Sequence, residues 1–146
     1  MNKTNNKIQN IEYIEDYRPS ESELVCLYDS VGWSAYTKNP TQLKQAIDQS
    51  LWVSSLFDQE KLIGLIRVVG DGVSIIYVQD ILIDPTYQHQ GLGSQLLQKA
   101  MHKFEDVRQF VLMSDDGQTN NGFYKKNGLT KTSDANLVNY FRKHTQ

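Results

Sequence analysis

A short glycine-containing segment, Gln88 to Gly93, stands between an apolar β-rich run and an amphipathic helical run. Glycines at positions 91 and 93 would let the backbone approach a ligand closely. A helix that begins at Leu92 leaves its first N–H groups without intrahelical partners, and its dipole is positive at that end. The segment is therefore suited to bind an anion, and a pyrophosphate would satisfy both features.

Two familiar phosphate-binding motifs are excluded by single positions. A Walker A loop requires Gly-Lys-Ser/Thr, whereas Gly93 is followed by Ser94 and Gln95, and the next lysine is Lys99. A dinucleotide-binding fingerprint requires a small residue where Leu96 stands. The loop therefore either serves another kind of phosphorylated ligand or is a glycine-rich turn without a ligand.

The segment resembles the acyl-CoA loop of the GNAT superfamily of N-acetyltransferases, which has Arg or Gln, two residues, Gly, one residue, and Gly or Ala. Residues 81–85, Ile-Leu-Ile-Asp-Pro, resemble the strand and proline that precede this loop, and residues 123–129 resemble a second signature with an aromatic pair and a glycine. The order of predicted elements also matches, so the resemblance covers nearly the whole chain. Residues 31–36, 67–72 and 79–81 are similar to a group of short bacterial members.

The resemblance implies that acetyl-CoA is the co-substrate. Backbone N–H groups from about Gln90 to Ser94 would bind its pyrophosphate, and the edge of the strand from Ile81 to Ile83 would pair with the pantetheine amides. Many relatives have an asparagine before the last helix to hold the pantetheine, but residues 114–117 here are Ser-Asp-Asp-Gly, so that contact is not transferred. The expected cofactor-binding residues are Ile81, Leu82, Ile83, Gln88, His89, Gln90, Gly91, Leu92, Gly93 and Ser94.

The resemblance also implies two catalytic residues. Tyr124 matches the tyrosine that stands beside the thioester sulfur and can protonate the leaving thiolate. Asp80 lies where relatives often place an acid near the acceptor amine, which makes it the candidate general base. Tyr124 could instead be a core tyrosine, and Asp80 a carboxylate satisfied by hydrogen bonds in the sheet. Asp115 and Asp116 are weaker candidates that could simply cap the last helix.

Three aromatic residues, Tyr28, Trp33 and Tyr36, belong to the helical region that in this superfamily forms part of the acceptor cleft. An aromatic wall would suit an amine with an apolar body, although aromatic residues at such positions are also common in cores. The three histidines are scattered without the spacing of metal ligands, so no metal site is predicted.

Periodicity places these residues on elements. An apolar alternation from Ile8 to Ile14 predicts a first strand that ends near Arg18-Pro19, and serine and glutamate in capping-box spacing before helical periodicity predict a helix over 20–31. Asn39-Pro40 opens a second helix that ends near Ser50. The remaining predictions are strands at 51–57, 62–69 and 73–83, a helix from Leu92 to Phe104, a strand at 107–113, a helix at 119–126, and closing strands at 129–132 and 137–142.

These elements predict a single domain over residues 1–146 of class α/β (α+β). The expected architecture is a mixed, mainly antiparallel seven-stranded sheet with about four helices. The sheet should be splayed between the two central parallel strands, 73–83 and 107–113, with acetyl-CoA in the opening. The two strands should be parallel because one helix connects them.

The bulk composition narrows the function classes. The chain has 146 residues, 39% hydrophobic and 22% charged, which is typical of a folded globular protein. A net charge of −2 without a basic run disfavours nucleic acid, and no apolar run approaches the length of a membrane span. One cysteine, Cys26, excludes an internal disulfide. A cytoplasmic protein is expected.

The functional hypothesis is an N-acetyltransferase that moves an acetyl group from acetyl-CoA to a primary amine of a small molecule or peptide by direct attack. The alternative is a non-catalytic acyl-CoA-binding or regulatory domain with the same fold. No nucleic acid or membrane partner is expected, and a homodimer is compatible with this interpretation.

Overall fold

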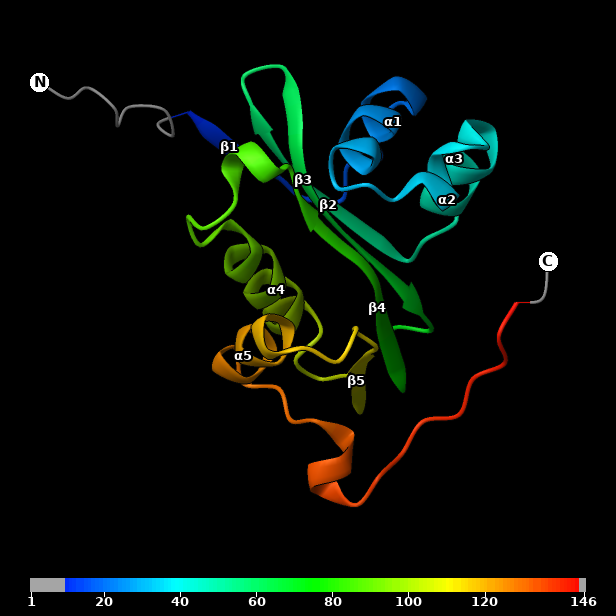
Figure 1. Cartoon of the computed structure of the whole chain (residues 1–146), viewed down its shortest axis with the longest axis vertical. Helices are drawn as coiled ribbons and strands as arrows, with labels where there is room; N and C mark the ends of the chain where they lie inside the picture. Colours follow the sequence, from blue (N-terminus) through cyan, green and yellow to red (C-terminus); the bar gives the residue numbers. More distant parts are fainter. Residues whose placement is uncertain (1–9, 145–146) are drawn as a thin grey trace, which may run out of the picture. The chain divides into compact units, whose positions relative to one another are not determined.

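A computed structural model describes residues 10–144, which belong to two compact units, residues 1–113 and residues 114–146 (Figure 1). The first unit contains the sheet and most of the helices, and the second contains the C-terminal segment. The predicted first strand began at Ile8, and its residues 8 and 9 lie outside the described part of the chain.

The elements follow one another in an order close to the predicted one. In the first unit they are β1 (Ile11–Ile14), α1 (Glu21–Ser30), α2 (Ser34–Thr37), α3 (Pro40–Asp48), β2 (Trp52–Asp58), β3 (Lys61–Gly70), β4 (Ile75–Ile83), the 3₁₀ helix η1 (Pro85–Tyr87), α4 (Leu92–Lys103) and β5 (Gln109–Leu112). The second unit contains α5 (Gln118–Lys126) and the 3₁₀ helix η2 (Thr132–Ala135).

The strands form one sheet in the order β1-β2-β3-β4-β5. Neighbours from β1 to β4 are antiparallel, and β4 and β5 are parallel, as the helical connection between them predicted. Helices α1 to α3 cover one face of this sheet and α4 covers the other (Figure 1). The core is therefore divided by the sheet, with one cluster around Leu24, Ile47 and Leu65 and another around Ile66, Ile76 and Leu96.

Local sequence signals explain where the helices begin and end. Ser20 and Glu23 form the predicted capping box at the start of α1, with the Ser20 hydroxyl accepting from the Glu23 N–H at 3.2 Å. Asn39 caps α3, which has Pro40 in its first turn. Gly128, at φ 95°, ends α5, where the N–H groups of Gly128 and Leu129 donate to carbonyls of the last turn.

A bulge in β4 sets the shape of the sheet near the predicted site. Arg67 pairs with Asp80 but Val68 pairs with Val78, so Gln79 is an extra residue on β4. The pairing of β4 with β5 ends at Val78 and Leu112, directly before the bulge. Beyond the bulge, β4 continues to Ile83 and, among the described residues, pairs there with β3 alone.

The prediction of a seven-stranded, mainly antiparallel sheet with about four helices is wrong. Residues 10–144 contain five α-helices and a five-stranded mixed sheet. The helix α2 was missed because four residues carry too little periodicity to be recognised. The predicted closing strands at 129–132 and 137–142 pair with nothing in the described chain; η2 and coil stand there instead.

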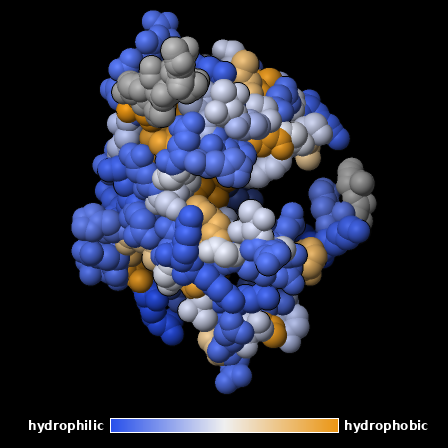
Figure 2. All heavy atoms as spheres, turned by 60° about the vertical axis from the view of Figure 1, so that its left-hand side comes forward, coloured by the Kyte–Doolittle hydropathy of each residue, from blue (hydrophilic) through white to orange (hydrophobic). Residues whose placement is uncertain are grey.

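Apolar and aromatic residue types mark a segment that is able to form a strand, but the segment becomes a strand only when it pairs with a neighbouring strand. Leu137, Val138, Tyr140 and Phe141 have the expected residue types and are 60% to 93% exposed. The face of the molecule in Figure 2 is largely hydrophilic, with apolar side chains in small patches. No helix among the described residues is both long enough and apolar enough to cross a membrane.

Candidate active site

The predicted pyrophosphate loop leads directly into α4. Gly91 is the N-cap residue of this helix, with φ 82° and ψ 6° in the left-handed region, and its carbonyl accepts from the Gln95 N–H at 3.0 Å. Glycine has no side chain to cap the first turn. A Cβ built on Gly91 would meet no atom within 4 Å, so the backbone faces open space. The first turn of α4 is thus presented to solvent in the manner that suits an anion.

Gln88 has a structural contact that sequence reasoning did not foresee. Its side-chain amide donates to the carbonyl of Ile83 at 2.9 Å, which folds the loop back onto the end of β4. His89 follows with φ 65°, an uncommon conformation for a residue other than glycine. Gln88 to Gly91 are exposed, whereas Leu92 to Ser94 are partly buried.

The strand edge predicted for pantetheine is available on one side of β4. The N–H of Asp84 donates to the carbonyl of Ile63 at 2.8 Å, so Asp84, Leu82 and Asp80 direct their backbone groups toward β3. By the alternation of an antiparallel ladder, Ile81 and Ile83 direct theirs to the opposite side. Because the pairing with β5 has already ended at Leu112, no strand among the described residues pairs with this edge of β4. Gln88 uses the Ile83 carbonyl, which leaves the Ile81 groups and the Ile83 N–H on the edge.

Asp80 lies at the centre of a buried polar cluster. Its carboxylate accepts from the Tyr28 hydroxyl at 2.8 Å, the Tyr36 hydroxyl at 2.7 Å and Nε of Arg67 at 2.8 Å. The Arg67 guanidinium also donates to the Ser50 hydroxyl at 3.3 Å. The side chains of Arg67 and Asp80 are 8% and 2% exposed, so this is a buried ion pair with its hydrogen bonds satisfied.

The cluster shifts the pKa values of its neighbours. Burial and then the charge of Asp80 raise the pKa of Tyr28 well above its ordinary value, and the same two causes raise that of Tyr36. Burial is the largest single influence on Arg67 and lowers its pKa, but the charge of Asp80, the hydrogen bond to it and the two tyrosines together outweigh burial and raise the arginine pKa. Both phenols therefore remain protonated donors at neutral pH, and Arg67 keeps its charge.

The three predicted acceptor-side aromatics are packed together. The Tyr28 ring lies 5.1 Å from Tyr36 and 5.9 Å from Trp33, both edge-on, and Trp33 lies 6.1 Å from Tyr36. Tyr28 is fully buried and belongs to the core, whereas Trp33 and Tyr36 are half-buried. Gln79, the bulge residue, donates to the Tyr36 hydroxyl at 3.4 Å. Sequence reasoning missed Arg67 and Gln79; a lone arginine within the apolar run of residues 62–69 was the available signal.

Tyr124 lies in the second unit, on α5. It is half-buried, its ring packs edge-on against Phe123 at 4.9 Å, and burial raises its pKa. Asp116 does not cap the backbone of α5: its carboxylate accepts from the Asn121 amide at 2.9 Å and pairs with Lys131 at 3.4 Å. Asp115 is exposed, and its carbonyl accepts from Asn120.

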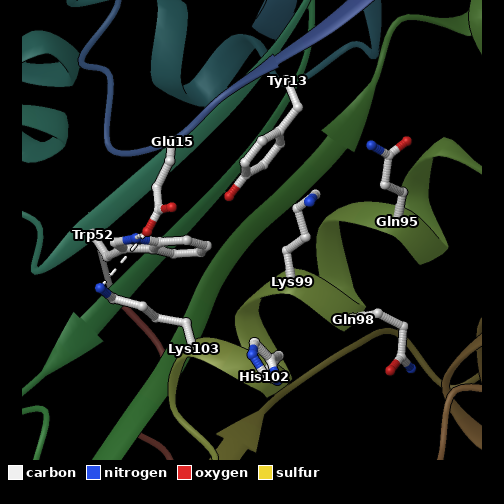
Figure 3. A pocket seen from close by; sticks show the side chains of 8 residues that line it. All are labelled: Tyr13, Glu15, Trp52, Gln95, Gln98, Lys99, His102 and Lys103. Carbon is white, nitrogen blue, oxygen red and sulfur yellow. Dashed lines mark hydrogen bonds and ion pairs between the residues drawn. The ribbon is translucent and has the colours of Figure 1, made fainter.

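A groove of about 470 Å³ lies elsewhere on the first unit, between α4 and strands β1 and β2 (Figure 3). Two of its lysines have contacts inside the groove. Lys103 pairs with Glu15 at 3.6 Å, and the Lys99 ammonium lies 4.3 Å from the centre of the Tyr13 ring. None of the predicted site residues lines it. Among residues 10–144, no three His, Cys, Asp or Glu side chains are arranged to hold a metal ion.

The sequence model of the acetyltransferase (GNAT) family matches residues 10–129, which include the loop, the Asp80 cluster and α5. The chain belongs to the GNAT family. A GNAT-family acetyltransferase from Streptococcus pneumoniae has the same fold with a TM-score of 0.82 and 31% identity, over 93% of this chain and 99% of that one.

Two curated relatives are similar in sequence. An uncharacterized N-acetyltransferase ycf52-like protein of Prochlorococcus marinus is 34% identical over 74% of this chain and 61% of its own length. A protein of Glycine max named histone acetyltransferase TAP1 is 32% identical over 64% of this chain and 45% of its own length. This GNAT chain therefore spans about three fifths of the length of the first of these two relatives and less than half of the second.

Proposed function

We propose that this GNAT chain transfers the acetyl group of acetyl-CoA to a primary amine of a small molecule or a peptide. The observation that carries the proposal is the pairing of two features on consecutive elements of the first unit. The strand β4 has an edge beyond its bulge, and the loop after it ends in an open glycine N-cap. A ligand with both amides and a pyrophosphate would use both features.

The residues present fit acetyl-CoA. Open space at the Cβ position of Gly91 allows a phosphate to approach the first turn of α4. The Ile81 backbone groups and the Ile83 N–H can pair with the amides of the pantetheine arm in the manner of a strand. The N–H of Ile83 is our candidate for polarising the thioester carbonyl. The exposed side chains of His89 and Gln90 flank the same loop.

The acceptor is proposed to bind on the α1 and α2 side of the sheet. Trp33 and Tyr36 keep exposed surface there, and the Asp80 cluster holds Tyr36 in place. Aromatic rings bind an apolar body and also attract a cationic amine. Because Tyr28 is fully buried, its proposed role is to support Tyr36 from beneath.

The chemistry requires two proton movements. The amine must be neutral when its nitrogen bonds to the thioester carbon, so it first gives a proton to Asp80 through the Tyr36 hydroxyl, or to water. When the carbon–sulfur bond breaks, the sulfur leaves as a thiolate, and Tyr124 is proposed to donate a proton to it. The raised pKa of Tyr124 suits a donor, because the phenol stays protonated at neutral pH.

The experiment that tests the proposal measures thermal unfolding with acetyl-CoA, NADH or ATP, and then thiol release with a panel of amines. A ligand bound to the native state alone adds about 2.7 kcal/mol of stability at a hundredfold excess over Kd. We expect acetyl-CoA to stabilise the protein far more than the other two. The panel contains polyamines, arylalkylamines, amino acids and lysine peptides, the last prompted by the name of the Glycine max relative.

Equal stabilisation by all three nucleotides would contradict an acyl-CoA site. Stabilisation by acetyl-CoA without thiol release for any amine would favour the alternative, a non-catalytic acyl-CoA-binding or regulatory domain. Thiol release with one amine class would identify the acceptor. A cytoplasmic location remains part of the proposal and is tested by fractionation of cells that express the natural protein.

A further inference from the structure

The loop between β4 and α4 contains a non-glycine residue, His89, in the left-handed region of backbone conformation. His89 and Gly91 have φ values of 65° and 82°, and Gln88 lies between the 3₁₀ helix η1 and these two residues. A non-glycine residue in the left-handed region is less stable than in the common regions and persists when contacts around it impose the conformation. The loop therefore needs ties to the rigid sheet.

Two ties join this loop to the turn between β2 and β3. The hydroxyl of Tyr87, the last residue of η1, donates to the Asp58 carboxylate at 2.5 Å. The ammonium of Lys61 pairs with the Asp84 carboxylate at 3.5 Å and lies 5.8 Å from the centre of the Tyr87 ring. Asp58 and Lys61 pair with each other across the β2–β3 hairpin. We call Asp58, Lys61, Asp84 and Tyr87 the hairpin clamp.

Asp84 connects the clamp to the start of the loop. Its carboxylate accepts from the Thr86 N–H at 2.9 Å and so caps η1. Its own N–H donates to the Ile63 carbonyl of β3 at 2.8 Å. Asp84 is 7% exposed, so the Lys61 pair has one buried partner and one solvent-exposed partner. One residue is thus held by the sheet, the hairpin turn and η1 together.

The hydrogen bond to Asp58 is the largest cause that raises the pKa of Tyr87 to about 12. A phenol with a folded-state pKa above its ordinary value of 10 contributes stability below pH 10 and loses that contribution as the pH rises toward 12. The donor is therefore present throughout the neutral range. A hydrogen bond to a charged acceptor is among the stronger kinds in proteins.

We propose that Tyr87 and Asp58 position the pyrophosphate loop, so that the open N-cap at Gly91 is formed before the ligand arrives. The inference rests on the proposed function in that the ligand is taken to be acetyl-CoA. Tyr87 and Asp58 act through the loop and do not touch the reacting atoms. Preorganisation lowers the ordering cost of binding and leaves the chemical step unchanged.

The test compares wild type with Tyr87→Phe, Asp58→Asn and the double variant. Tyr87→Phe keeps the ring beside Lys61 and removes the hydroxyl alone. The matched control is Tyr17→Phe, which also removes a hydroxyl that donates to a carboxylate, in this case that of Glu23 at 3.2 Å. Three quantities are measured: amide hydrogen exchange of residues 84–91 without ligand, Kd for acetyl-CoA by calorimetry, and kcat at saturating acetyl-CoA. Circular dichroism and thermal unfolding establish that each variant is folded.

We expect loop exchange to accelerate and Kd to rise by roughly tenfold in each single variant, with kcat within about twofold of wild type. The double variant should be no worse than the stronger single one, because both changes remove the same bond. Unchanged exchange of the loop in Tyr87→Phe would overturn the inference. If Kd rose while exchange stayed unchanged, the Tyr87 hydroxyl would contact the ligand directly. If Tyr87→Phe proves unstable, Asp58→Asn, which removes the charge of the acceptor in the same bond, decides the inference with the same readouts.

Failure of the proposed function is distinguishable from failure of the clamp. If wild type does not bind acetyl-CoA, the proposed function fails, but the exchange of residues 84–91 still decides whether Tyr87 and Asp58 hold the loop.

Discussion

The carboxylate of Asp80 accepts hydrogen bonds from residues on α1, α2 and β3. Its lone pairs are largely used by these donors, and its charge is matched by the buried guanidinium of Arg67. A general base needs a free position to receive a proton from the acceptor. The contacts therefore favour a role in which Asp80 fixes Tyr36 and the sheet and receives a proton only through the Tyr36 hydroxyl, not directly from the amine.

Asp80→Asn should destabilise the protein by about 3 kcal/mol or more, because it leaves the Arg67 charge buried without a counter-ion. Urea unfolding measures this loss. The control, Asp48→Asn, breaks the exposed i,i+4 pair with Lys44 and should cost about 0.5 kcal/mol or less. If Asp80→Asn is as stable as wild type while kcat falls about a hundredfold, Asp80 is the base and the structural role is secondary.

Tyr124→Phe keeps the ring and its packing against Phe123 but removes the proposed proton donor. We expect kcat to fall by about 10² to 10⁴, with little change in acetyl-CoA affinity or stability. Since burial raises the tyrosine pKa, wild-type activity should not decline from ionisation of this phenol below pH 10. Stopped-flow thiol release with a good acceptor gives kcat when chemistry limits the rate.

A folded Tyr124→Phe variant that keeps more than about a third of wild-type kcat would make Tyr124 a packing residue. The Tyr17→Phe variant again serves as the matched control, because its hydroxyl contacts Glu23 and not the proposed site.

At the scale of elements, one extra residue in β4 has two consequences. The bulge at Gln79 shifts the alternation, so that Val78 and Ile81 face α4 while Asp80 faces α1 and α2. It also coincides with the end of β5 pairing, which opens the strand edge from Ile81 onward. The placement of the acid and the opening of the proposed ligand edge thus have one local origin.

The helix α4 provides a test of the proposed anion site. Gly93 lies inside this helix, so Gly93→Val introduces a β-branched side chain near the first turn without a left-handed backbone requirement. We expect acetyl-CoA Kd to rise by about tenfold or more while the protein stays folded, because the side chain obstructs the approach of the pyrophosphate. Calorimetric titration measures Kd, and Gly93→Ala should give a smaller increase.

Gly91 is less suitable for that purpose. Its φ of 82° means that any side chain strains the backbone even though the space around its Cβ position is open. A Gly93→Val protein that binds acetyl-CoA with wild-type affinity would refute the placement of pyrophosphate at the first turn of α4.

At the scale of the whole molecule, the C-terminal segment exposes apolar side chains that ordinarily lie inside proteins. Leu137, Val138, Tyr140 and Phe141 lie within five residues and are 60% to 93% exposed. Such a concentration of exposed apolar surface typically marks an interaction site. We expect these residues to be buried against a second copy of the chain, consistent with the homodimer hypothesis.

Light scattering after gel filtration tests this expectation. Wild type should be a dimer, and the double variant Tyr140→Ser/Phe141→Ser should be a monomer. Asn139→Ser is the control from the same segment and should leave the dimer intact. A wild-type protein that remains monomeric over the accessible concentration range would rule out the homodimer.

The sequence by itself determined the local features of this protein. The capping box at Ser20, the proline in the first turn of α3 and the glycine that ends α5 were all predictable, because their causes lie within a few residues. The parallel pairing of β4 and β5 followed from the helix between them. Residue types and spacing in the loop also pointed to the GNAT family, which the family comparison then established.

The tertiary structure decided what depends on partners distant in sequence. The bulge at Gln79 depends on β3, and the contacts of Asp80 come from Tyr28, Tyr36 and Arg67 on three separate elements. The tie between Tyr87 and Asp58 joins residues separated by 29 positions. For the same reason residues 137–142 were wrongly predicted as a strand. Apolar and aromatic residue types specify which residues could pair, whereas the pairing itself depends on whether a free strand edge comes within hydrogen-bonding distance.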